Sequence, residues 1–164
     1  MGIPRVLNLW STHQFWIGFL GALGIEARHI EFSSDSSEEQ ARQFAKGRGT
    51  VDCCYPVKCM SGHYGELLAR DGRHKIDVLL SPMIASLPSY LDGHVVASLA
   101  SPRVMAAPEN IKAGFIKERD LFAEHGVRYA APLVSLSEPA LVPKQLFAAL
   151  REVIPGLRSE ERRV

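Results

Sequence analysis

The sequence has no long apolar run and no surplus of charge. Its most apolar stretch, residues 15–25, contains three glycines and is only eleven residues long, whereas a transmembrane helix needs roughly 20 apolar residues. Nineteen Lys and Arg oppose eighteen Asp and Glu, which leaves a net charge of +1. We therefore expect no membrane span and no nucleic-acid or anionic-membrane partner.

Cysteine is scarce and clustered. The three cysteines are Cys53, Cys54 and Cys59, an odd and crowded set unlike the even, spread framework of a disulfide-rich secreted domain. The first residues also lack the cationic start and unbroken apolar core of a secretory signal, because Pro4 and Asn8 interrupt them. We expect a cytoplasmic protein whose thiols are reduced or bind a metal or cluster.

Familiar nucleotide and hydrolase motifs are missing. Gly47-Arg48-Gly49 lacks the Lys-Ser or Lys-Thr of a P-loop, and Gly18, Gly21 and Gly24 recur inside an apolar segment instead of following a strand. No Gly-x-Ser-x-Gly nucleophile elbow is present. The composition, with 46% hydrophobic and 23% charged residues in a chain of 164, is that of an ordinary folded protein.

Apolar runs alternate with capped helical patterns. Strands are expected at residues 5–9, 27–32, 77–81, 127–131 and, more briefly, within 94–99. Helices are expected from Ser11 or Thr12 to Gly24, then over 38–46, 56–70, 108–126 and 143–154. The serine-rich stretch 33–37 is expected to cap the helix over 38–46. This order predicts an α/β fold, a three-layer sandwich with a mostly parallel sheet of about four or five strands.

The cysteine segment is the most distinctive local feature. If a helix begins at Pro56, the Cys54 thiol lies just outside a helix N-terminus, where the helix dipole stabilises a thiolate, and Lys58 lies one turn inside. Cys59 and His63 share a helix face, so Cys54, Cys59 and His63 form a candidate zinc site. The alternative interpretation makes Cys53 and Cys59 small buried hydrophobes and His63 a structural histidine.

An uncharged aromatic segment precedes it. Residues 11–25 carry no Asp, Glu, Lys or Arg, and large apolar side chains cover much of the expected helix. Such a helix is either central in the core or covered by a partner.

Several ordered motifs resemble one family. They are Gly2-Ile3-Pro4-Arg5-Val6-Leu7-Asn8, Phe15-Trp16, Leu23-Gly24, Cys54-Tyr55-Pro56-Val57-Lys58, Gly62-His63, Pro82-Met83-Ile84, Leu87-Pro88, Gly93-His94-Val95-Val96 and residues 103–115. Together they resemble the domain of unknown function in proteins related to the 2-hydroxyacyl-CoA dehydratase activases. The domain itself is similar to the subunits of 2-hydroxyglutaryl-CoA dehydratase and benzoyl-CoA reductase, and the resemblance spans Gly2 to about Leu150.

The resemblance implies iron–sulfur chemistry. In the related subunits cysteines hold a four-iron cluster, and Cys54 matches the first ligand, while Met83 and Ser101 stand where many relatives have cysteine. A thioether or hydroxyl replaces a thiolate poorly, so Cys53 and Cys59 are the candidate additional ligands. Lys58, Gly62 and His63 belong to the same motif and are expected beside the cofactor.

These expectations give two functional hypotheses. The first is an accessory or electron-relay domain of an activase-related protein that binds an iron–sulfur cluster, without catalysis of its own. The second is a docking module that packs on an activase ATPase module, a dehydratase subunit or a second copy of the chain. Residues 1–155 would form one domain, as a fragment of a larger protein, and residues 156–164 a solvated tail.

Overall fold

The computed structural model describes residues 1–45, 47–48, 53–91, 94 and 98–155. In these ranges the helices are α1 (Asn8–Ala22), α2 (Glu38–Phe44), α3 (Tyr55–Leu68), α4 (Pro102–Met105), α5 (Ala107–Ile116), α6 (Leu121–Glu124) and α7 (Val142–Val153). The strands are β1 (Gly2–Ile3), β2 (Glu31–Phe32), β3 (Val78–Leu80), β4 (Met83–Ser86), β5 (Arg128–Ala130) and β6 (Leu133–Ser135). Short 3₁₀ turns lie at Ala27–His29 and Gly72–His74.

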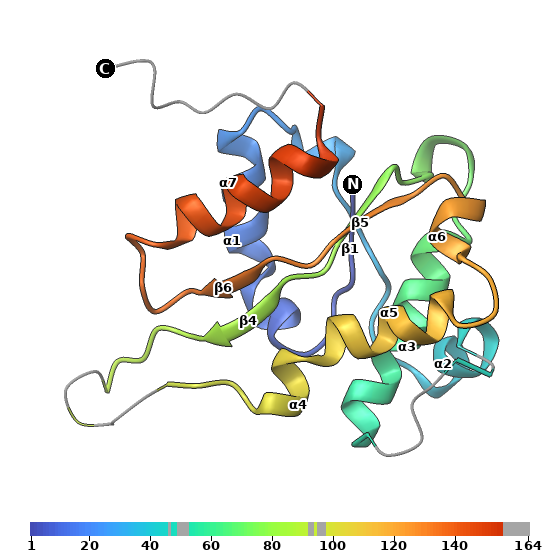
Figure 1. The fold of residues 1–164 in the computed structure, drawn as a ribbon, viewed down its shortest axis with the longest axis horizontal. Coiled ribbons are helices and arrows are strands. Elements are labelled where there is room, and N and C mark those ends of the chain that lie inside the picture. Colours follow the sequence, from blue (N-terminus) through green and yellow to red (C-terminus); the bar gives the residue numbers. More distant parts are fainter. Residues whose placement is uncertain (46, 49–52, 92–93, 95–97, 156–164) are drawn as a thin grey trace.

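The strands form two parallel sheets. One has the order β2-β1-β3-β5, and the other pairs β4 with β6 (Figure 1). The second sheet continues the first, because the Ser81 N–H donates to the Ala130 carbonyl at 2.8 Å and the Met83 N–H donates to the Pro132 carbonyl at 2.9 Å. Proline has no N–H to donate to a ladder, so Pro82 and Pro132 divide what is otherwise one long strand pair.

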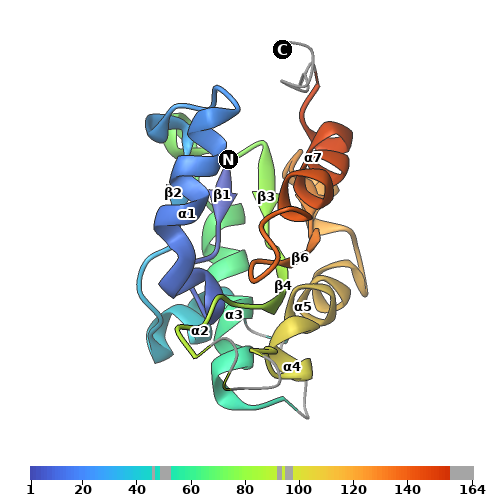
Figure 2. The same cartoon turned by 90° about the vertical axis from the view of Figure 1, so that its left-hand side faces the viewer.

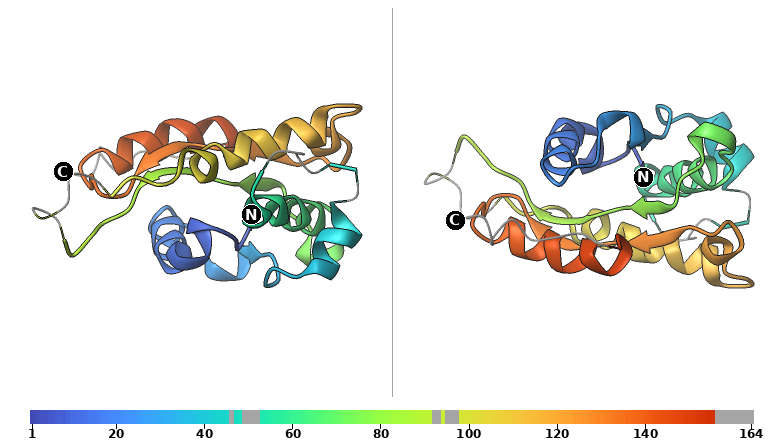
Figure 3. Two further views of the ribbon diagram at one scale, coloured as in Figure 1. Left: turned by 90° about the horizontal axis from the view of Figure 1, so that it is seen from below. Right: turned by 90° about the horizontal axis from the view of Figure 1, so that it is seen from above.

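Helices cover both faces of these strands. Helices α1, α2 and α3 lie on one side, and α4 to α7 lie on the other (Figures 2 and 3). The α/β sandwich with a mostly parallel sheet is therefore confirmed.

The core has two apolar clusters. One joins α3 to α5 and α6 around Tyr64, Leu79 and Phe115. The other joins α1 to α7 around Trp16, Leu80 and Leu146. Strand β3 contributes Leu79 to one cluster and Leu80 to the other, so both of its faces are buried. The apolar run in the sequence predicted this burial.

The start of the chain differs from the sequence prediction. The strand is Gly2–Ile3 instead of residues 5–9, and α1 already begins at Asn8. Ser11 and Thr12 do not cap it; both lie inside the helix, where the Thr12 hydroxyl donates to the Asn8 carbonyl at 2.7 Å. Leu7 takes the N-cap position with φ 53° and ψ −134°, a conformation that side chains other than glycine rarely adopt. Because leucine rarely has a positive φ, the sequence did not indicate that the chain turns at Leu7.

Other boundaries follow local capping. Ser37 caps α2 as expected, since its hydroxyl accepts the Gln40 N–H at 3.0 Å. The single helix expected over 108–126 is divided, because Asp120 caps a new turn by accepting the Ala123 N–H at 3.0 Å. Strands β4 and β6 were not predicted.

Two predicted segments cannot be compared in full. Residues 95–97 of the expected strand at 94–99 lie outside the described residues, and Leu99 forms one antiparallel bridge with Ser86. The tail expected at 156–164 also lies outside them. Within the described ranges, no helix is both long and apolar enough to span a bilayer.

Candidate functional site

Helix α3 begins with an exposed cysteine. Cys54 occupies the N-cap position, and its backbone carbonyl accepts the N–H groups of Val57 at 3.0 Å and Lys58 at 3.1 Å. Its thiol forms no capping hydrogen bond and is exposed to solvent. Tyr55 is the first helical residue and Pro56 the second, so the helix starts one residue earlier than expected. Cys54 therefore lies just before the start of a helix, as the sequence predicted.

The other two cysteines are less accessible. Cys59 is only 5% exposed, and Cys53 is partly buried and packs against the apolar cluster of α3, α5 and α6. The environment of Cys59 matches the alternative interpretation of a small buried hydrophobic residue, whereas Cys53 is only partly buried.

The positions that differ from the family pattern lie on other elements. Met83 begins β4 and is partly buried, whereas Ser101 is exposed at the N-cap position of α4. Figures 1 and 2 both show α4 and the N-terminal end of α3 at the lower end of the molecule. Two helix starts, one with a cysteine and one with a serine, therefore share one end of the fold.

The zinc site expected at Cys54, Cys59 and His63 does not form. Among the described residues, no three His, Cys, Asp or Glu side chains are grouped so that they could hold a metal ion. Both ring nitrogens of His63 are already hydrogen-bonded to serine hydroxyls, Ser33 at 2.7 Å and Ser36 at 2.8 Å. Cys59 and His63 do share a face of α3, but the prediction did not include Ser33 and Ser36, which come from outside the helix and bind His63.

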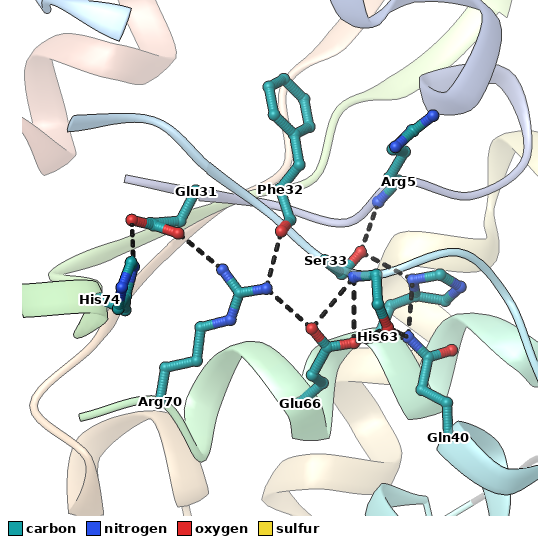
Figure 4. Close-up of polar contacts among 10 residues, drawn as sticks. Arg5, Glu31, Phe32, Ser33, Gln40, His63, Glu66, Arg70 and His74 are labelled. Atoms are coloured by element: carbon teal, nitrogen blue, oxygen red, sulfur yellow. Dashed lines mark hydrogen bonds and ion pairs between the residues drawn. The ribbon is translucent and has the colours of Figure 1, made fainter. Parts of the chain in front are cut away.

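His63 instead belongs to a polar network that joins α3 to neighbouring segments (Figure 4). Its side chain is fully buried. The Ser33 hydroxyl oxygen accepts the Arg5 backbone N–H at 2.7 Å and lies 2.7 Å from Nδ1 of His63. The amide Nε2 of Gln40, which can only donate, lies 3.3 Å from the same Nδ1, so Nδ1 is the acceptor. Nε2 then carries the ring proton and donates a hydrogen bond to the Ser36 hydroxyl oxygen. In this arrangement His63 cannot accept the Ser36 proton, so it joins the 33–37 loop to α3 and does not activate a nucleophile.

Burial keeps the His63 ring neutral. Removal from water lowers the pKa of His63 to about 4, although the nearby carboxylates of Glu66 and Asp35 act in the opposite direction. The ring is therefore uncharged at neutral pH.

Glu66 extends the network along α3. Its carboxylate accepts hydrogen bonds from the Ser34 N–H at 3.0 Å, the Ser34 hydroxyl at 2.7 Å, Gln40 Nε2 at 2.6 Å and Arg70 Nη2 at 2.8 Å. Burial raises the pKa of Glu66, but these hydrogen bonds together outweigh it and bring the pKa below its ordinary value. Arg70 in turn pairs with Glu31 of β2 at 2.8 Å. The network thus ties α3 to β2, to α2 and to the loop between them.

Gly62 allows two helices to cross closely. A Cβ on Gly62 would lie 2.9 Å from the Ala41 Cα of α2, closer than side-chain atoms approach backbone. Lys58 is partly buried one turn from the helix start. Gly62 and His63 therefore have packing and hydrogen-bonding roles in the structure, while Lys58 stays near the Cys54 end.

Sequence reasoning missed most of this network. Ser33, Gln40, Glu66 and Arg70 were not identified as site residues. The serine-rich stretch 33–37 was the available signal, but it was interpreted only as a helix cap.

The comparisons with known proteins decide the family. The family model described as the CoA enzyme activase uncharacterised domain (DUF2229) matches residues 1–163. The chain belongs to this family. The resemblance found from the sequence motifs is confirmed. No curated protein and no solved structure matches the chain.

Proposed function

We propose that this member of the CoA enzyme activase family is an accessory domain that presents Cys54 to an activase or dehydratase partner. The observation that carries the proposal is the exposed Cys54 thiol, which makes no capping hydrogen bond at the start of a 14-residue helix. The other candidate ligands of this motif are not accessible, because Cys59 is buried and His63 is hydrogen-bonded to two serines.

The described residues do not fit a cluster held by this chain alone. A four-iron cluster takes four thiolates in its usual form, and only Cys54 among the three cysteines is exposed. Met83 and Ser101 supply no thiolate. A cluster at this end of the fold would therefore take its other ligands from the partner, with Cys54 as one ligand of a shared electron-relay site.

Anaerobic reconstitution tests this role. The chain, alone and mixed with its activase or dehydratase partner, is treated with iron(II) and sulfide and followed by absorbance and EPR. We expect a cluster signal that depends on both components, is lost in Cys54→Ser and persists in the matched variant Cys59→Ser. An undiminished signal in Cys54→Ser would contradict the proposal.

A second candidate role is docking through α1. Most of its large apolar side chains serve the core, with Trp16 and Leu20 fully buried, but Trp10 is 56% exposed and Phe15 39% exposed. Exposed aromatic side chains of this size are frequent at contact surfaces. The buried side chains of α1 belong to the core, and the exposed aromatic side chains support the docking role.

Co-purification separates the docking role from the Cys54 role. Trp10→Ser together with Phe15→Ser should abolish capture by an activase or dehydratase partner. Ile116→Ser, which changes an exposed apolar residue of α5 on the opposite face of the sheet, should not. Equal capture of both variants would exclude the α1 surface.

A further inference from the structure

A cationic cleft lies outside the polar network of α3 and is lined by other segments of the chain. It has a volume of about 120 Å³ and lies between the segment after α2, at Gly47 and Arg48, and the turn between α5 and α6, at residues 117–119. Figure 1 shows α2 and the α5–α6 turn on the same side of the molecule. The cleft joins two segments about 70 residues apart in a chain whose formal net charge is +1.

The charges that line the cleft are mostly positive. Arg48, Lys117 and Arg119 face it together with one acid, Glu118. Arg119 pairs with Glu124 at 3.5 Å, but both side chains are well exposed, and such pairs contribute little. In the part of the chain that the structure describes, Arg48 and Lys117 form no ion pair.

Arg48 is held in place before any ligand arrives. Its guanidinium lies over the ring of Phe115, 5.5 Å from the ring centre, and Phe115 is only 1% exposed. A Cβ on Gly114 would lie 2.5 Å from the Arg48 carbonyl oxygen, so the absence of a side chain at Gly114 lets the two segments meet. A stacked guanidinium loses less conformational freedom when it binds an anion.

We propose that this cleft binds the phosphoryl group of a small molecule. The planar fork of an arginine matches a phosphate oxygen pair, and Lys117 and Arg119 add charge from the opposite wall. A competing explanation is that Lys117 and Arg119 only complement the negative end of the α5 dipole. That explanation does not account for Arg48, which comes from another segment and stacks on the floor of the cleft.

Titration of the complete chain by calorimetry tests the assignment. The probes are inorganic phosphate and pyrophosphate, with succinate as a dicarboxylate of different geometry, all in 0.15 M chloride to screen diffuse attraction. We expect saturable binding of a phosphate probe, at least tenfold weaker in Arg48→Gln and at least threefold weaker in Lys117→Gln. Arg28→Gln removes the same charge from an exposed arginine paired with Glu26 and should bind as the unaltered protein does.

Three results would overturn the proposal. They are the absence of saturable phosphate binding, equal affinity for succinate, and equal loss of affinity in Arg28→Gln. Melting curves without ligand separate binding from folding, since Lys117 is exposed and its substitution leaves the cleft floor intact. A lower melting temperature of Lys117→Gln with unchanged phosphate affinity would support the dipole explanation and reject the site.

Discussion

The two halves of the motif on α3 differ in surroundings. At the helix start, Cys54 is exposed and its thiol makes no capping hydrogen bond. Two turns later His63 is fully buried with both ring nitrogens bonded, and Glu66 accepts several hydrogen bonds. Both halves lie in one short stretch of sequence, yet one is placed for contact with a partner and the other stabilises the fold.

This contrast separates two reasons for finding polar residues close together. A polar group that is buried needs hydrogen-bond partners, and the His63 network supplies them from β2, α2 and the loop between these elements. An exposed thiol at a helix end has no such structural need. The contrast predicts that changes near His63 affect stability, whereas changes at Cys54 affect only function.

The largest effect is expected at the helix crossing beside His63. A Cβ on Gly65 would overlap the Phe44 carbonyl of α2, so Gly65→Ala must push α2 away. We expect a loss of about 3 kcal/mol in the free energy of unfolding, measured by urea denaturation. In the control Gly18→Ala the new methyl group meets no atom within 4 Å, and helix propensity predicts a gain of up to about 1 kcal/mol. A similar loss in both variants would contradict the close crossing.

Acid should weaken the fold through His63. The pKa of His63 is about 4 in the folded chain and about 6.5 in an unfolded one, so the unfolded state binds more protons between these values. Stability is then full above pH 6.5 and falls by up to about 3 kcal/mol as the pH drops to 4. His63→Gln removes this slope. Denaturation curves from pH 8 to pH 4 measure it, and an identical slope in the variant would refute the assignment.

A smaller effect is expected at Glu66. Glu66→Gln keeps the shape but removes the charge that Arg70 and Ser34 meet, so we expect a loss of about 2 kcal/mol in unfolding free energy. Glu38 also pairs with an arginine, Arg42, but both side chains are well exposed. Glu38→Gln should therefore change stability by less than about 0.5 kcal/mol. Equal effects in the two variants would mean that the network adds nothing beyond surface pairing.

The smallest effect on stability is expected at Cys54. Its exposed thiol has no capping role, so Cys54→Ala should alter the free energy of unfolding by less than about 0.5 kcal/mol. Thermal melts of this variant beside Cys59→Ser provide the comparison, because a hydroxyl at the buried Cys59 position should cost about 1–3 kcal/mol. A large loss in Cys54→Ala would give this residue a structural role.

The sequence predicted features whose cause is local. The Ser37 cap, the start of α3 near Pro56 and the buried strand β3 all depend on residues next to each other in the chain. The expected strands end at residues 81 and 131, directly before Pro82 and Pro132, whereas in the structure the strand pair resumes after these prolines as β4 and β6.

The site was predictable only in its local half. The place of Cys54 before a helix follows from Pro56, which stands two residues later. The environment of His63 depends on Ser33, which is 30 residues away in the chain and meets it only after folding. A histidine four residues after a cysteine indicates a shared helix face but not which other elements pack on that face.

Cysteine-resolved alkylation of the native protein tests the contrast on α3 most directly. The 164-residue chain is treated with iodoacetamide over time, with and without urea, and each thiol is quantified by mass spectrometry. Cys54 should react in the folded protein at least tenfold faster than Cys59, whose labelling should rise in step with unfolding. Equal labelling of Cys54 and Cys59 in the folded state would contradict the division of α3 into an exposed functional start and a buried structural middle.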